Sequence, residues 1–316
     1  MRRLLLICAV SAAALWAQTG ADLVSEGNEA LENGQLEKAE QLYTRASRLS
    51  GDVALAGVNG LYSVFEQRGK PEEGMKIFRE HYAQTGDLQY ITMGATRLVE
   101  SGRTEQAARE LAPILERLKK GERLSPAITA SMAFTLQRTG DLEGALNAAR
   151  HAEESFRSIH SVQWVVMGDL VASLLEDSGR TLEALSEYEF ILQEGPENPL
   201  ILNNYAYYLA VHNKDLERAA TLVRRSLVLQ PGDGNALDTL GFILLKLGKV
   251  EESIDAMVKA WRRHPDIMVV RTHLAQSLAK RKSTSKTMQE LLDVLRTEPD
   301  PENTAQIEQL LAALGE

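Results

Sequence analysis

One short pattern recurs along most of this chain of 316 residues. A glycine is followed three positions later by glutamate and five positions later by a small residue, first at Gly34, Glu37 and Ala39. The pattern begins again at four glycines, and in a shifted form at a fifth: Gly69, Gly102, Gly140, Gly248 and Gly179. Seven residues before each glycine lies another small or medium-sized residue. With two weaker copies around Ala206 and Ala275, that residue recurs every 33 to 39 positions. This period constrains the fold strongly, because a fixed period of about 20–50 residues is typical of repeat arrays.

Each copy reads as two helices joined by a tight turn. In the copy that starts at Leu237, apolar or small residues lie at i, i+3, i+4 and i+7, up to Leu244, which forms one stripe of a helix. Gly248 follows where a helix end needs a left-handed residue. Glu251 falls in the first turn of a second helix, where the helix dipole favours an acid. Pro265 ends that helix, because proline cannot continue one. Prolines stand at the same place in three other copies: Pro196, Pro231 and Pro299.

The copies resemble the tetratricopeptide repeat family, and the chain is similar to exported bacterial members. The family pattern of bulky residue, Leu, Gly, aromatic, Ala, aromatic, Ala and Pro is matched in order by Leu237, Leu240, Gly241, Leu244, Ser253, Met257, Ala260 and Pro265. The first copy matches it with Leu23, Gly27, Ala30, Ala39, Tyr43 and Ala46. The resemblance covers about residues 20–301. It implies an all-α fold, a right-handed α-solenoid of about eight helix-turn-helix repeats; one long helical bundle is the alternative.

The period places the repeats and a final cap. We expect repeats at 20–53, 55–88, 88–121, 126–159, 165–198, 199–233, 234–267 and 268–301. Residues 302–316 add one more amphipathic stripe, which reads as a C-terminal capping helix, because each repeat buries its face only against a neighbour. The second copy departs from the pattern with Tyr62 and Gly74 at its close-contact positions, so we expect looser packing there.

The first 17 residues have the layout of a secretory signal peptide. Arg2 and Arg3 precede an uncharged stretch, residues 4–17, and then small residues. That stretch is short for a membrane span, which needs about 20 residues. We expect cleavage near Ala17 and Gln18 and a periplasmic or secreted protein with no stable membrane span; an uncleaved anchor is the alternative. Removal of Cys8, the only cysteine, would leave the mature chain without a thiol.

Composition and motifs argue against several classes of function. The net charge of −9 argues against nucleic-acid binding, since a basic surface supplies most of that affinity. No two of the six histidines lie at i and i+4, and no phosphate-binding Gly-x-x-x-x-Gly-Lys-Ser/Thr pattern occurs. We therefore expect a protein that is not an enzyme and uses no cofactor and no metal.

Function is then expected on the face of the first helices, which the resemblance places along the concave groove. Its outward positions are Asn28, Asn59, Ser63, Phe134, Asp169, Asn203, Tyr207, Asp238, Phe242, Thr272 and Gln276. Tyr207 and Phe242 hold the same place in adjacent repeats and should lie side by side. Aromatic area flanked by amides suits peptide binding, so we predict that Asn203, Tyr207, Asp238 and Phe242 form the densest part of a protein-binding site. The alternative is that both rings only pack between hairpins.

Two other sets of residues bear on possible binding sites. Some family members bind a C-terminal carboxylate through cations in the first and third repeats, but Val24, Gln89 and Met93 stand at those positions, which argues against such a clamp. Residues 259–286 hold one acid and eight bases: Lys259, Arg262, Arg263, Arg271, Lys280, Arg281, Lys282 and Lys286. The first repeat is acidic, so this segment suggests an anionic partner or head-to-tail self-association; the alternative is an ordinary solvated face.

These observations favour a scaffold that binds protein or peptide partners in the cell envelope. A structural subunit of an envelope assembly, such as a polysaccharide-export or pilus-associated complex, is the alternative.

The N-terminal layout gives a direct prediction. Protein purified from the cell envelope should begin near Gln18, because a signal peptidase would remove the apolar stretch. N-terminal sequencing measures this. An intact Met1 on protein from the soluble cytoplasm would contradict both the cleavage and the export.

Overall fold

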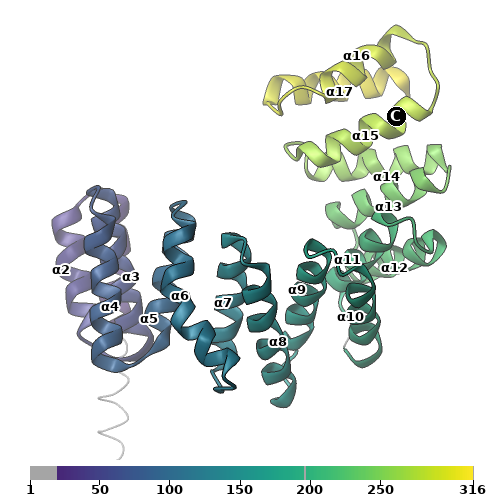
Figure 1. The fold of residues 1–316 in the computed structure, drawn as a ribbon. Helices are drawn as coiled ribbons and strands as arrows, with labels where there is room; N and C mark the ends of the chain where they lie inside the picture. Colours follow the sequence, from purple (N-terminus) through teal and green to yellow (C-terminus); the bar gives the residue numbers. More distant parts are fainter. Residues whose placement is uncertain (1–19, 196, 316) are drawn as a thin grey trace, which may run out of the picture. The chain divides into compact units, whose positions relative to one another are not determined.

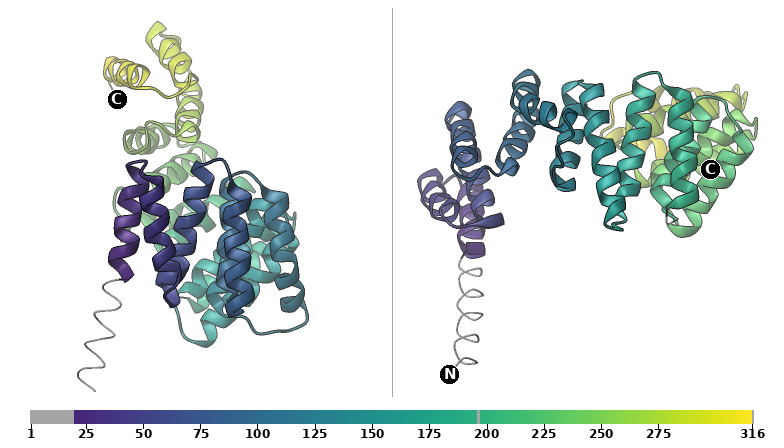
Figure 2. Two further views of the ribbon diagram at one scale, coloured as in Figure 1. Left: turned by 90° about the vertical axis from the view of Figure 1, so that its left-hand side faces the viewer. Right: turned by 60° about the horizontal axis from the view of Figure 1, so that its bottom comes forward.

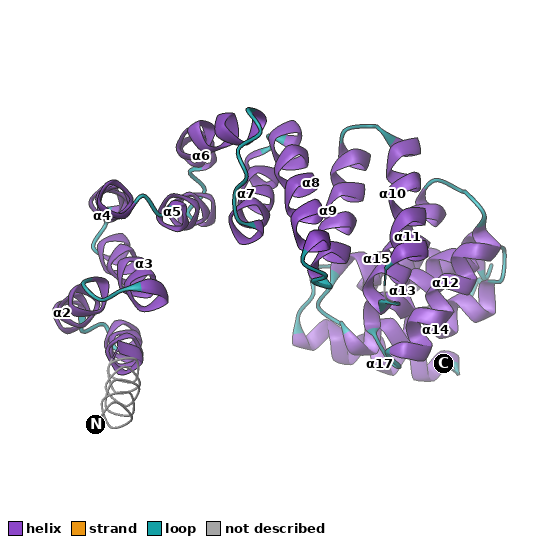
Figure 3. Cartoon of the chain, turned by 90° about the horizontal axis from the view of Figure 1, so that it is seen from below, coloured by secondary structure: helices purple, strands orange, loops and turns teal. Residues whose placement is uncertain are grey.

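The structure, a computed structural model, describes residues 20–195 and 197–315. Throughout these ranges the chain is built from helices and short loops, with no β-strand, so the all-α prediction is confirmed (Figure 3). The predicted signal peptide, with Cys8, lies outside the described residues, and so does Pro196.

The chain divides into two compact units, Met1–Thr181 and Leu182–Glu316 (Figure 1). In the first unit a helix over residues 20–32 precedes α2 (Leu36–Ser47), α3 (Gly51–Gln67), α4 (Pro71–Thr85), α5 (Leu88–Glu100), α6 (Thr104–Lys119), α7 (Pro126–Thr139), α8 (Leu142–Ser158) and α9 (Gln163–Asp177). The helices at the start of this unit lie side by side (Figure 2). Helices α3, α5 and α7, the first helices of three consecutive hairpins, also contact one another in that order.

The second unit continues the alternation. It contains nearly all of α10 (Thr181–Glu194), then α11 (Pro199–Val211), α12 (Leu216–Leu229), α13 (Gly234–Lys246), α14 (Val250–Arg263), α15 (Met268–Lys280), α16 (Lys286–Leu295) and α17 (Pro301–Leu314). Here the first helices α11, α13 and α15 contact one another in order. Side chains on their common face can therefore form one continuous surface within the unit.

The turn glycine has the role that the repeated pattern predicts. Gly248 has φ of 75°, and its N–H donates to the Leu245 carbonyl while the next N–H, from Lys249, donates to the Leu244 carbonyl. These two bonds satisfy carbonyls that the end of α13 leaves unpaired. In the α15–α16 turn Lys282 takes a left-handed conformation instead, with φ of 54°. The turn geometry is thus kept even where the glycine is absent.

Close contact between helices depends on small residues opposite large ones. The ring of Tyr43 on α2 is fully buried between two glycines of neighbouring helices. A Cβ atom added at Gly27 would lie 2.6 Å from that ring, and one added at Gly60 would lie 2.3 Å from it. The Tyr43 hydroxyl donates to the Oδ1 atom of Asn28 at 2.7 Å. Side-chain volume at these positions therefore sets how closely the hairpins stack.

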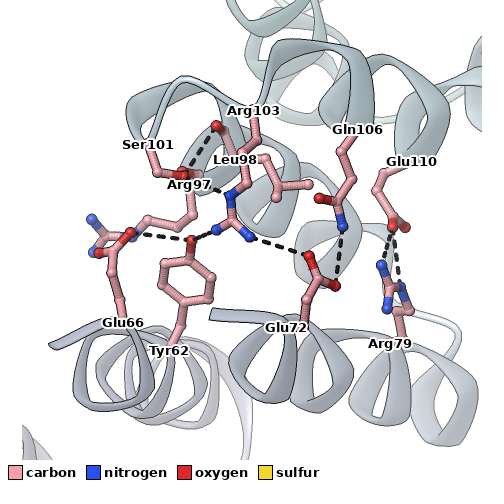
Figure 4. A network of polar contacts seen from close by, with 10 residues as sticks. All are labelled: Tyr62, Glu66, Glu72, Arg79, Arg97, Leu98, Ser101, Arg103, Gln106 and Glu110. Carbon is pink, nitrogen blue, oxygen red and sulfur yellow. Dashed lines mark hydrogen bonds and ion pairs between the residues drawn. The ribbon is translucent and has the colours of Figure 1, made fainter. Parts of the chain in front are cut away.

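The second hairpin reverses this arrangement. Tyr62, on its first helix, is fully buried, and a Cβ added at Gly74 would lie 2.8 Å from its ring. The glycine on the second helix leaves the space that the tyrosine fills, so the sizes of the two close-contact residues are exchanged in this hairpin. Arg103 donates to the Tyr62 hydroxyl at 2.5 Å and to Glu72 at 3.2 Å, which ties α3 and α4 to the start of α6 (Figure 4). Burial raises the pKa of the Tyr62 phenol.

A test of this packing uses glycine at the Tyr43 ring. Gly60→Ala should lower the free energy of unfolding by about 1–3 kcal/mol, because the added methyl overlaps the ring and the helix must shift. In a Tyr43→Leu background the same change should instead be neutral or stabilise by up to about 1 kcal/mol, since alanine is the better helix former. Chemical denaturation of the four proteins measures this coupling. An equal penalty in both backgrounds would show that the ring is not the obstacle.

Candidate functional site

A row of rings crosses the first helices of the second unit. Tyr207 on α11 is 42% exposed, and its ring centroid lies 6.0 Å from that of Phe242 on α13. Phe242 stacks in turn on His273 of α15, with centroids 4.9 Å apart and planes at 19°. The expected neighbourhood of Tyr207 and Phe242 is therefore present in the structure. Phe242 also packs against the apolar core of this unit, so only Tyr207 offers a largely free ring.

Asp238 does not lie on the exposed face, which corrects the sequence-based placement. It is 8% exposed, and its Oδ2 atom lies 2.9 Å from Nδ1 of His273. The carboxylate turns toward the adjacent helix because the imidazole offers a polar partner there, and a buried polar group needs one. The pair fixes the imidazole against which Phe242 stacks. Asp238 thus positions the row rather than contacting solvent.

Polar groups flank the rings. Asn203, on α11, is half-buried; its amide nitrogen donates to Asn204, but its Oδ1 atom is buried with no hydrogen-bond partner among the described residues. Lys246 places its Nζ atom 4.9 Å from the centroid of Phe242 and donates to Asn213 at 2.8 Å. An unpaired buried acceptor costs free energy, and this one lies beneath the surface, out of reach of a partner. The accessible part of the face therefore consists of the Tyr207 ring and its polar neighbours.

The two predicted positions of this face on α15 are exposed to solvent. Thr272 and Gln276 on α15 are both exposed, and the hydroxyl of Thr272 donates to the Met268 carbonyl. Neither makes a contact with the ring row that the structure records. They extend the polar margin of the face without adding a second cluster.

The predicted positions in the first unit form a different environment. Asn28 is exposed and accepts the Tyr43 hydroxyl, while Asn59 is half-buried and accepts from Nε of Arg97 at 2.7 Å. Phe134 on α7 is 45% exposed. Asn28 and Asn59 are engaged within the chain, and Phe134 has no ring partner among the described residues, so no aromatic row forms here.

The basic segment does not form one free patch. Four of its members, three exposed and Arg281 half-buried, pair with acids of the same unit: Lys259 with Asp255, Arg262 with Glu308, Arg281 with Glu251 and Lys286 with Glu290. Exposed pairs of this kind leave less net positive charge for a partner. Arg263, Lys280 and Lys282 supply most of the remaining charge.

Arg271 was assigned to that patch, and this assignment is wrong. Its side chain is 0% exposed, because it extends inward from α15 to the junction of α16 and α17. It donates to the carbonyls of Val294 and Thr297 at 2.9 and 3.3 Å, and to Oδ1 of Asn303 at 3.2 Å. A cation suits the carbonyl end of a helix. The pKa of the Arg271 guanidinium is lowered from its usual value, because the effect of burial exceeds the opposing effect of the Asp300 carboxylate.

His273 and Arg271 were not identified from the sequence in their actual roles. Their polar partners, Asp238 and Asn303, lie 35 and 32 residues away, about one repeat along the chain. That separation is the only sequence signal, since it equals the distance between stacked hairpins. The search for histidines at helical spacing could not detect it.

The described ranges contain neither a candidate metal site nor a candidate membrane span. None of the groups of histidine, cysteine and acidic residues there has the arrangement of a metal site. No helix there combines the length and the apolar character of a membrane span.

Comparisons with known proteins agree with the repeat architecture. A family model described as tetratricopeptide repeat matches residues 172–234. A TPR repeat-containing protein of Pseudomonas aeruginosa is 24% identical over 206 residues, which are 62% of this chain and 32% of that protein. Residues 172–234 are thus similar to the tetratricopeptide repeat family. The chain spans about a third of the length of this curated relative, so the two share repeats rather than whole architecture.

Solved structures show the same fold at low identity. A tetratricopeptide repeat protein from Parabacteroides merdae matches with a TM-score of 0.51 at 16% identity, covering 83% of this chain and 99% of that one. The apo form of the quorum sensor NprR from B. thuringiensis matches with a TM-score of 0.53 at 16% identity, covering 93% and 94%. These matches show that the chain has the helical solenoid fold seen in tetratricopeptide repeat structures.

The buried Arg271 leads to a prediction about the stability of the last helices. Arg271→Met should lower the free energy of unfolding by about 1–3 kcal/mol, because the carbonyls of Val294 and Thr297 lose their charged donor. Hydrogen exchange of the α17 amides should accelerate at the same time. Lys280→Met, an exposed change on the same helix, is the control and should alter neither quantity. Equal effects of the two changes would contradict a structural role for Arg271.

Proposed function

We propose that this protein is a non-enzymatic scaffold of the cell envelope that binds a partner polypeptide on the face of its first helices. The observation that carries the proposal is the exposed ring of Tyr207 beside Phe242. The ring offers rigid apolar area of the kind on which interfaces with polypeptides depend. Lys246 and Gln276 add polar contacts at the margin.

In this proposal, some residues of the face contact the partner and others hold those residues in place. Tyr207 would contact it directly, because nearly half of its surface is free. Phe242 is half-buried and held by His273, so it would serve as the floor of the site. Asp238 holds His273 from below. This division explains why one exposed ring should dominate the affinity while its neighbours keep it in place.

The envelope location rests on the N-terminal layout of residues 1–17, and export would bring the face to periplasmic or secreted partners. The alternative assignment, a structural subunit of an envelope assembly or of a polysaccharide-export or pilus complex, uses the same face within a larger complex. Head-to-tail self-association would need the basic segment, and its internal ion pairs weaken that possibility.

Site-specific crosslinking tests the proposed face. A photoreactive phenylalanine analogue at position 207, in protein expressed in its own cells, should give a covalent adduct with a partner polypeptide. The same analogue at position 228 is the matched control, since Val228 is 78% exposed but lies on a second helix, α12. Adducts from position 228 alone, or equal adducts from both positions, would contradict the proposal.

The adduct identifies a partner for a quantitative test. Tyr207→Ala should weaken binding of that partner by roughly 30-fold, equivalent to about 2 kcal/mol, as is common for an aromatic at the centre of an interface. The melting temperature should stay nearly unchanged because the ring is exposed. If Tyr207→Ala unfolds the protein instead, the ring has a packing role.

A further inference from the structure

The first unit has a pocket between α5 and α7. Its volume is about 180 Å³, and it is lined by Thr96, Val99, Ser131, Phe134, Thr135 and Arg138. Pockets that hold whole small molecules usually measure roughly 300–1,000 Å³. A space of this size suits a single side chain, and all of its walls belong to one unit.

The two threonines that line the pocket use their hydroxyl protons within the chain. Val99 and Thr135 are buried, and the hydroxyls of Thr96 and Thr135 lie 3.1 Å apart across the two helices. The Thr135 hydroxyl also donates to the Ser131 carbonyl at 2.8 Å, and that of Thr96 donates to the Thr92 carbonyl at 3.0 Å. Because these hydroxyls are already paired, the pocket gains most from an aliphatic side chain, which demands no hydrogen bond.

The rim of the pocket is charged and partly aromatic. Phe134 is 45% exposed, and Arg138 lies about one turn further along the same face of α7, four residues on. The Arg138 side chain is exposed and makes no ion pair within the described part of the chain. Arg97, the cationic residue of α5, is by contrast bonded to Asn59 and Glu100. The free charge at this rim is therefore positive.

We propose that this pocket binds an aliphatic side chain of an extended partner segment, and that Arg138 pairs with an acidic side chain two residues further along that segment. In an extended chain, side chains at i and i+2 point to the same side, about 6.6 Å apart. Four residues of α7 rise about 6 Å. Phe134 and Arg138 both line the pocket, so an extended segment that runs along α7 can place an aliphatic side chain beside Phe134 and the side chain two residues on beside Arg138. Charge complementarity makes that second side chain an acid.

This site is separate from the ring row of the second unit and does not rest on it. It also needs no chain end, because the carboxylate comes from a side chain. The pocket would therefore recognise an internal segment of a partner by two side chains at a fixed spacing. Its position on α5 and α7 makes it a second subsite with its own chemistry.

Blocked peptides test the spacing directly. The probe is acetyl-Gly-Gly-Leu-Gly-Asp-Gly-Gly-amide, and the control of equal composition is acetyl-Gly-Gly-Leu-Asp-Gly-Gly-Gly-amide; a third peptide carries Asn in place of Asp in the probe. Full-length protein with labelled threonine methyl groups is titrated to millimolar peptide and followed by NMR. The methyl signals of Thr96 and Thr135 should shift with the probe. The two other peptides should bind about 2- to 5-fold more weakly, the range expected for loss of one exposed ion pair.

Three protein variants complete the test. Arg138→Gln should make the three peptides bind alike, whereas Arg48→Gln, which removes another exposed arginine of the same unit, should keep the difference. Ser131→Leu should fill the pocket and abolish the methyl shifts, with unchanged helicity by circular dichroism. Absence of methyl shifts, equal binding of all peptides to the unmodified protein, or a persisting preference in Arg138→Gln would overturn the proposal. Methyl shifts that depend on protein concentration without peptide would show that a second copy occupies the pocket, which also overturns it. Crosslinking from position 207 remains independent of all these outcomes.

Discussion

Close approach of neighbouring helices is the constraint on which this structure depends. The ring of Tyr43 fits between Gly27 and Gly60 with no room for a methyl group on either glycine. In the next hairpin Tyr62 fits against Gly74 in the same way. Each hairpin thus completes its neighbour, because a single pair of helices cannot enclose its apolar face. The faces of the first helices remain free for recognition as a result of this stacking.

The regular part of the fold could be predicted because it repeats. Turn glycines such as Gly248, the apolar stripe that begins at Leu237 and the neighbourhood of Tyr207 and Phe242 all follow from position within a period. Equivalent residues of stacked repeats occupy equivalent places, so one register locates them all. For the same reason the sequence indicated the correct helix face at Tyr207 without any knowledge of distances.

The irregular part could not be predicted, because it depends on which partner each polar side chain meets in the next hairpin. Asp238 has the position of a groove residue but turns toward His273, and Arg271 has the position of a surface cation but reaches Asn303. A periodic pattern describes the average environment of a position and not its particular neighbour. The sequence therefore predicted a larger basic surface than the structure has, because Arg271 is buried. It also predicted a carboxylate in the groove at Asp238, where the structure has a buried one.

The buried Arg271 has a consequence for how the array opens at its end. Repeat arrays commonly fray one element at a time, since each contacts only its neighbours. Here one guanidinium joins α15 to the end of α16 and to the start of α17. Departure of α17 alone would remove the Asn303 contact and expose part of the apolar surroundings of a charged group. The last three helices should therefore open together, as one cooperative block with a single local stability.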